Sequence, residues 1–143
     1  MSLNVELLNS SFAEIELRAD DFTDCFYQTL FTDYPEVKPL FSNTHIDEQG
    51  KKLFASLVLV VKNLTAPNTL IDVLRGLGTR HIKYGVLPKH YPMVGETLLK
   101  SMSFILQDRW TDETAIAWTE AYQAIAEIML DGCNYPQIVL HPE

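Results

Sequence analysis

The sequence has few cysteines and no long apolar run. It therefore lacks both the disulfides that stabilise chains without a large hydrophobic core and a segment that would anchor the chain in a membrane. Only two of its 143 residues are cysteines, Cys25 and Cys133, which excludes a framework of disulfides and the closely spaced thiols of a zinc site. No run of 18 apolar residues occurs, and the N-terminal segment lacks a basic stretch followed by an apolar one. We therefore expect a reduced, cytoplasmic protein with no membrane partner.

Positive charge is also scarce. Eleven Lys and Arg stand against 19 Asp and Glu, which gives a net charge of −8, and the cations are scattered along the chain. Nucleic acids and anionic membranes are bound through clustered basic residues, so neither is an expected partner. The six glycines form no phosphate-binding loop, and no Gly-x-Ser-x-Gly motif occurs, which removes the common signatures of nucleotide binding and serine hydrolysis.

Helical periodicity, in contrast, runs through almost the whole chain. Apolar residues make up 47% of the sequence, enough for a core, and strand-like alternation is almost absent. We predict an all-α fold in one domain over residues 1–143, with a helical core over about 4–132 and a tail over 133–143. Four of the predicted helices cover residues 4–17, 19–33, 46–64 and 89–107. Another begins at a cap on Asn68 or Thr69 and ends at a stop signal over 84–88, and the last runs from a cap at Thr111 to Gly132. The proline-rich stretch 34–41 is predicted to form one tight turn.

His81 is the first candidate for a function. Leu70, Leu74 and Leu77 recur at helical spacing, and His81 continues their stripe, so an imidazole lies on a face predicted to be buried. Taken alone, such a residue is more often a core histidine hydrogen-bonded to a backbone carbonyl than a ligand. The four histidines show no i, i+4 pairing, so a site built from several histidines is not predicted.

Three segments change the interpretation of His81. CFYQTLFTDYPEVKPLF (25–41), GTRHIKYGVLPKHYPMVGETLL (78–99) and AWTEAY (117–122) resemble the globin family, and within it the bacterial single-domain haemoglobins and the globin domain of flavohaemoglobins. The resemblance extends over about residues 5–132. It implies the globin fold with the family's helices A, B, C, E, F, G and H, a short or absent D helix, and haem b as cofactor.

The resemblance also implies a role for individual residues. His81 falls on the position of the proximal iron ligand, Phe41 on the aromatic residue that wedges against the porphyrin, and Tyr27 and Gln49 on the distal residues that stabilise the bound ligand. We expect the second ring nitrogen of His81 to bond to a carbonyl of the preceding helical turn, which orients the ring and raises its basicity. The other implied haem contacts are Lys52, which would pair with a propionate, together with Leu53, Leu57, Leu77, Val86, Tyr91 and Val94.

Tyr91 matches a tyrosine that flavohaemoglobins place beside the iron-bound histidine. The glutamate that accompanies it in that family has no counterpart, since Tyr135 stands at the aligned position. A strongly activated, peroxidase-like proximal side is therefore not predicted.

The implied function is reversible binding of dioxygen, and of nitric oxide and carbon monoxide, by a monomer or weak dimer. One alternative is a nitric oxide dioxygenase fed by a separate reductase, since we expect no flavin or nicotinamide domain in this chain. Another is a globin-fold gas or redox sensor. Locally, Tyr27 could instead reach the surface, Gln49 could be a solvated helix residue, and His45 or a Tyr27 phenolate could act as an internal iron ligand.

Overall fold

A computed structural model of the chain describes residues 3–41, 45–83 and 86–131. Within these ranges it contains no strand, and its helices are α1 (Val5–Glu16), α2 (Ala19–Asp33), η1 (Pro35–Phe41), α3 (Ile46–Lys62), α4 (Pro67–Lys83), α5 (His90–Leu106), η2 (Gln107–Arg109) and α6 (Asp112–Asp131). The all-α prediction is confirmed, and most helix ends agree within two residues. None of the helices in the described ranges combines the length and apolarity needed to cross a bilayer.

Local chemistry explains the starts of α1, α4 and α6. Asn4 caps α1 by accepting a hydrogen bond from the Leu7 N–H at 3.2 Å, and Thr111 caps α6, as predicted, by accepting one from the Thr114 N–H at 3.2 Å. The predicted cap of α4 at Asn68 or Thr69 was wrong, because the helix begins at Pro67. A proline in the first turn has no N–H to satisfy and a φ already suited to a helix, so it is a good first residue.

Parts of three other predicted segments lie outside the residues that the structure describes. The tight turn expected at 34–41 is a 3₁₀ helix over Pro35–Phe41, and the loop that follows it includes 42–44, which lie outside the described ranges. The predicted stop of α4 includes residues 84 and 85, and the predicted tail 133–143 also lies outside them.

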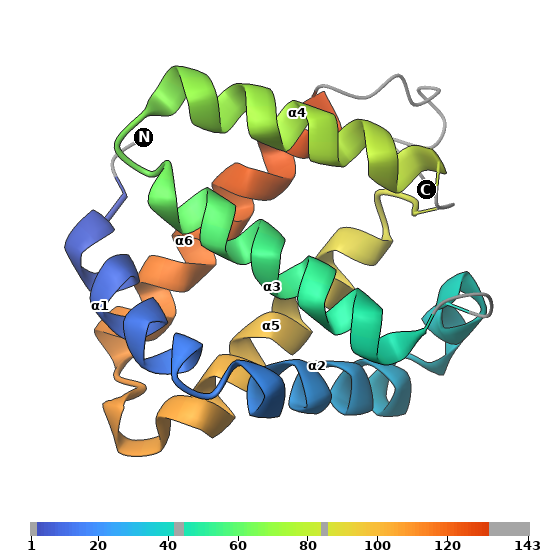
Figure 1. Cartoon of the computed structure of the whole chain (residues 1–143), viewed down its shortest axis with the longest axis horizontal. Helices are drawn as coiled ribbons and strands as arrows, with labels where there is room; N and C mark the ends of the chain where they lie inside the picture. Colours follow the sequence, from blue (N-terminus) through green and yellow to red (C-terminus); the bar gives the residue numbers. More distant parts are fainter. Residues whose placement is uncertain (1–2, 42–44, 84–85, 132–143) are drawn as a thin grey trace.

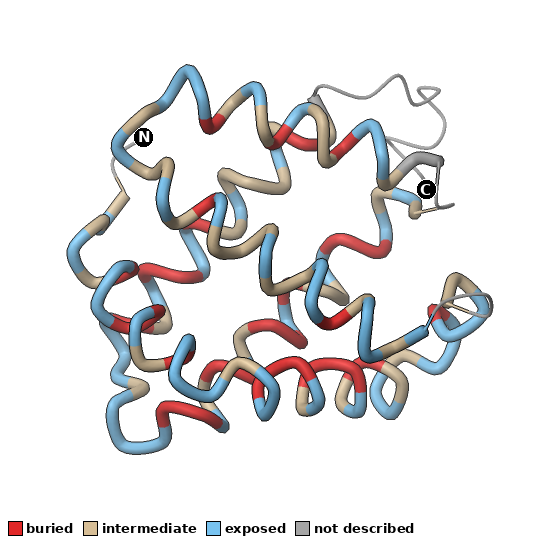
Figure 2. Tube along the Cα trace, viewed as in Figure 1, coloured by how far each residue is buried: buried red, intermediate tan, exposed pale blue. Residues whose placement is uncertain are grey.

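The helices are arranged so that α2 and α4 lie along opposite edges of the molecule, with α3 running between them and α5 and α6 behind (Figure 1). The buried positions of each helix recur on the side that faces its neighbours (Figure 2). This pattern follows from the apolar stripes of the sequence, because each helix must cover one face.

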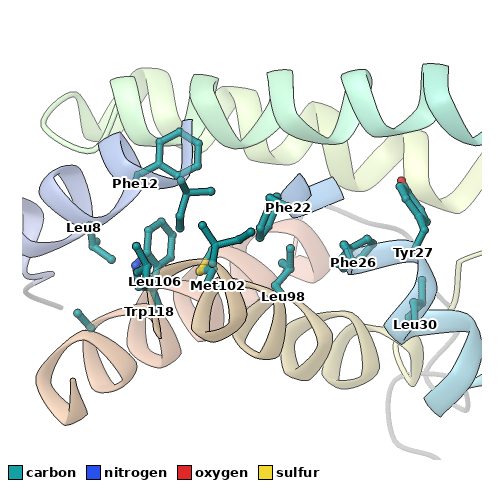
Figure 3. Close-up of a cluster of buried hydrophobic side chains, with 14 of the residues drawn as sticks. Leu8, Phe12, Phe22, Phe26, Tyr27, Leu30, Leu98, Met102, Leu106 and Trp118 are labelled. Carbon is teal, nitrogen blue, oxygen red and sulfur yellow. The ribbon is translucent and has the colours of Figure 1, made fainter. Parts of the chain in front are cut away.

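The main hydrophobic cluster joins α1, α2, α5 and α6. Figure 3 shows Phe12, Phe22, Met102 and Trp118 converging in it, and the Trp118 indole N–H donates to the Ser11 Oγ at 2.9 Å, so the buried polar atom is satisfied. A second, smaller cluster lies among α3, α4, α5 and α6 and consists of Val60, Leu70, Leu74, Tyr91 and Met129. This second cluster borders a cavity.

Candidate functional site

The cavity has a volume of about 400 Å³ and lies among α3, α4, α5 and α6, a size common for small-molecule sites. We call it the central cavity. Its wall consists mainly of apolar side chains with a few polar ones: Gln49, Lys52, Leu53, Ala55, Ser56, Leu57, Val60, Leu74, Leu77, Arg80, His81, Val86, His90, Tyr91, Val94, Leu98, Tyr122, Ile125 and Met129.

The sequence-based candidates divide into two groups. Nine of them line the central cavity, namely His81, Gln49, Lys52, Leu53, Leu57, Leu77, Val86, Tyr91 and Val94. Tyr27 and Phe41 are not part of its wall. The helical spacing of the candidates on α3 explains why they meet, because residues 49, 52, 53 and 57 lie three to four apart and so share one face.

His81 lies in the last turn of α4, with its imidazole in the cavity wall. Its Nδ1 is 2.7 Å from the carbonyl oxygen of Leu77, one turn earlier, so the predicted carbonyl partner is present. Because a carbonyl only accepts, Nδ1 carries the ring proton and donates it. The neutral tautomer with a lone pair on Nε2 is the form that ligates a metal.

The surroundings of His81 also favour the neutral ring. Burial lowers the pKa of His81, the positive charge of Arg80 lowers it further, and the bond to the Leu77 carbonyl acts in the opposite direction. The ring of Tyr91 lies nearby, with its centroid 6.4 Å from that of His81 and the two planes inclined by 37°. His81 is therefore held as a neutral imidazole among apolar and aromatic neighbours.

Two cations contribute to the cavity wall from different helices. Lys52 belongs to α3 and Arg80 to α4, and both side chains are exposed. Exposed cations beside an apolar cavity can pair with acidic groups of a ligand that remain at the solvent edge. Lys52 was predicted for this role. Arg80 was not, although it directly precedes His81 in the sequence and so lies at the edge of the helix face that carries His81.

Tyr27 lies in a cluster of aromatic rings beyond the central cavity. Its ring centroid is 5.6 Å from that of Phe41 and 5.9 Å from that of Phe31, and its exposed fraction is 5%. Figure 3 shows its hydroxyl directed toward α3. Burial raises the pKa of Tyr27 to about 12, and a hydrogen bond with Gln49 acts in the opposite direction. Tyr27 is therefore a buried, neutral phenol.

Several wall residues had no assigned role in the sequence. His90 is buried, and its Nδ1 accepts a hydrogen bond from the Leu87 N–H at 2.9 Å. Tyr122 donates its hydroxyl proton to the Tyr91 carbonyl at 2.7 Å, and burial raises its pKa. Tyr122 lies four residues after Trp118 on α6, so helical spacing places the two side chains on one face. The sequence did not indicate that His90 is buried, because His90 is the first residue of its helix and no apolar stripe precedes it there.

One residue named in the alternatives, His45, is also placed. His45, a possible internal ligand, is exposed at the N-cap of α3 and is not part of the cavity wall. Tyr135 lies outside the described residues. Cys25 is a free thiol on α2.

Comparison with known proteins agrees with this geometry. The globin family model matches residues 24–129. A flavohemoprotein of Rhizobium meliloti (strain 1021) is 37% identical over 73% of the chain and 26% of its own length, and flavohemoprotein A of Dictyostelium discoideum is 30% identical over 90% of the chain and 32% of its own length. The chain therefore spans about a quarter to a third of these relatives.

A solved structure is similar to this chain over about nine tenths of both chains. A bacterial globin from Campylobacter jejuni aligns with a TM-score of 0.78 and 31% identity, covering 90% of this chain and 92% of that one.

Proposed function

The chain belongs to the globin family, and we propose that it binds haem b in the central cavity and, through it, dioxygen, nitric oxide and carbon monoxide reversibly. The observation that carries the proposal is the state of His81, a neutral imidazole in the wall of an apolar cavity whose Nδ1 proton is held by the Leu77 carbonyl. An imidazole in this state could ligate the haem iron.

The rest of the cavity wall fits the same cofactor. Its apolar side chains, such as Leu53, Leu57 and Val94, would cover a large flat aromatic ring, and Lys52 and Arg80 would pair with its two carboxylates. Haem, when bound, would supply an iron atom that His81 could ligate and that could bind a diatomic gas. The chain must then bind this ring, orient His81 and exclude water from the iron.

The proposed distal side depends on Tyr27 and Gln49. Burial keeps the Tyr27 phenol protonated at neutral pH, so it can donate a hydrogen bond, and Gln49 can donate from its amide group. Two donors stabilise a ligand that carries partial negative charge, such as dioxygen, more than one that does not, such as carbon monoxide. We infer slow release of dioxygen, which suits scavenging or detoxification better than bulk transport.

The flavohemoprotein relatives motivate one extension of the proposal. Their name denotes flavin together with haem, and this chain matches only a quarter to a third of their length. If the chain turns over nitric oxide, we propose that a separate flavin-containing reductase supplies electrons. Sustained nitric oxide consumption with reduced nicotinamide that requires an added reductase would support this extension.

We also propose a cytoplasmic location and a monomer or weak dimer.

The first experiment is an absorption spectrum of the purified protein as isolated, after reduction with dithionite, and after carbon monoxide. We expect a strong Soret band that shifts at both steps. The matched comparison is His81→Ala against Phe104→Ala, since Phe104 is 55% exposed on α5 and outside the central cavity. We expect only His81→Ala to lose the band or to require added imidazole to restore it. If the unmodified chain shows no Soret band even after haemin is added, the proposal is wrong.

A further inference from the structure

The start of α5 is hydrogen-bonded to the residues that precede it, and these are bonded in turn to α4. Toward α4, the Val86 N–H donates to the His81 carbonyl oxygen at 3.0 Å. Toward α5, the Leu87 N–H donates to Nδ1 of His90 at 2.9 Å, and the His90 N–H donates back to the Leu87 carbonyl, also at 2.9 Å. Val86 and Leu87 are therefore fastened to the end of one helix and to the start of the next.

The two bonds between Leu87 and His90 act as a helix cap. They resemble the half of a capping box in which a side chain in the first turn accepts the N–H of the residue before the helix, a task that usually belongs to glutamate or glutamine. Pro88, which lies between the two residues, has no N–H to satisfy and suits a first turn. Here the acceptor is an imidazole nitrogen, which can accept only while it carries no proton.

The capped residues form part of the wall of the central cavity. Val86 and His90 both line the cavity, and His81, whose carbonyl holds Val86, lines it too. Val86 is half-buried, and His90 is only 8% exposed. Loss of the bond to His90 would leave the Leu87 N–H without its acceptor and would weaken the attachment of this part of the wall to α5.

We propose that His90 is a positioning residue that fastens this part of the wall while its ring is neutral, and that its protonation loosens the wall and speeds release of the bound cofactor. Protonation places a hydrogen on Nδ1, so that two donors then face each other, Nδ1–H and the Leu87 N–H. The inference rests on the proposed function, because it concerns how long the central cavity retains haem.

The charges around His90 favour the fastened wall at neutral pH. Burial lowers the pKa of His90, the Lys89 charge lowers it further, and Glu36 from η1 opposes the change. Among the described residues no carboxylate lines the cavity, and its other titratable side chains are Lys52 from α3, Arg80 and His81 from α4, Tyr91 from α5 and Tyr122 from α6. His90 is therefore neutral at pH 7 and gains its proton only as the pH falls.

Transfer of haem to an excess of a haem-free acceptor globin, followed by absorbance at pH 7 and pH 5, tests the proposal. At pH 7, His90→Leu should release haem about twofold to tenfold faster, as expected for the loss of one hydrogen bond. His90→Asn should match the unmodified chain, because Oδ1 can accept the Leu87 N–H. A side chain that only filled space would give the reverse order, since leucine fills a buried site better than asparagine. Between pH 7 and pH 5, release from His90→Asn should accelerate less than release from the unmodified chain.

His45→Asn is the matched control, because His45 is an exposed histidine at the N-cap of α3 whose side chain makes no capping bond and is not part of the cavity wall. Its release rates should equal those of the unmodified chain at both pH values. An equal acceleration in His90→Asn and in the unmodified chain would overturn the proposal. So would faster release at pH 7 from His90→Asn than from His90→Leu. Should His90→Leu fail to fold, the comparison with His90→Asn still decides.

A second readout does not depend on haem. In nitrogen-15 NMR of the purified full-length chain, recorded on the diamagnetic carbon monoxide complex if haem is present, the ring nitrogens of His90 and the amide of Leu87 should change with the same pH midpoint. A Leu87 amide signal that stays constant while His90 takes up its proton would contradict the proposed cap. Absence of a Soret band would instead refute the proposed function, and with it the release step, whereas the NMR titration would still decide whether His90 is a pH-dependent cap.

Discussion

At the residue scale, the protonation state of Tyr27 decides what the proposed distal side can do. Burial raises its pKa to about 12, so it remains a phenol and a donor at neutral pH, and the alternative of a phenolate iron ligand is disfavoured. We expect Tyr27→Phe to speed dioxygen dissociation tenfold or more, since one charge-assisted hydrogen bond contributes roughly 1.5 to 3 kcal/mol. Stopped-flow mixing of the oxygenated protein with carbon monoxide measures this rate.

Tyr34→Phe is the matched control, because Tyr34 lies at the end of α2, outside the wall of the central cavity, and donates its hydroxyl proton to the exposed Glu96 carboxylate. Its dissociation rate should stay unchanged. If Tyr27→Phe behaves like Tyr34→Phe, Tyr27 has no donor role.

At the element scale, two glycines inside helices differ in what surrounds them. A Cβ at Gly95 on α5 would lie 2.5 Å from the ring of Tyr122 on α6, and that ring is held by its hydrogen bond to the Tyr91 carbonyl. A Cβ at Gly76 on α4 would meet only the flexible end of Arg80, at 3.7 Å. Gly95→Ala should therefore lower the free energy of unfolding by about 1 to 3 kcal/mol through overpacking.

Gly76→Ala serves as its control and should raise the free energy of unfolding by up to about 1 kcal/mol, because alanine favours the helix. Urea denaturation followed by circular dichroism compares the two. Equal effects of both substitutions would mean that the contact between α5 and α6 at Gly95 does not limit packing.

At the scale of the whole molecule, the buried His90 makes stability depend on pH. Burial lowers the pKa of His90, the Lys89 charge lowers it further, and Glu36 opposes the change. Below about pH 6.5 the His90 side chain therefore binds a proton more readily in the unfolded chain than in the folded one. The stability that the neutral His90 contributes is complete above that pH and is lost as the pH falls. We expect the free energy of unfolding to decrease between pH 7 and pH 5.

His90→Asn tests the assignment, because an asparagine Oδ1 can accept the Leu87 N–H in place of Nδ1 without titrating. The variant should show a smaller decrease in urea denaturation between the same two pH values. Some dependence should remain, since burial also lowers the pKa of His81. An unchanged decrease in His90→Asn would show that His90 does not contribute.

Much of the fold and part of the site could be predicted from the sequence because they depend on neighbours along the chain. Apolar spacing identified the helices and the buried face of His81, and the carbonyl partner of His81 was predictable because Leu77 lies one turn earlier in the same helix. The cap at Thr111 is local in the same sense. The cap of α4 was misassigned because Pro67 competes with Asn68 and Thr69 as a helix start.

Only the tertiary structure decided which side chains meet across helices. The packing of α2 against α3 helps to bury Tyr27, and the packing of α5 on α6 brings Tyr122 to Tyr91. His90 likewise enters the cavity wall through the position of α5. The periodicity of apolar residues indicates which face of a helix is buried. It does not indicate which helix packs against that face, because this depends on helix crossing angles and on close approaches such as that at Gly95. Many residues that are far apart in the chain determine these together.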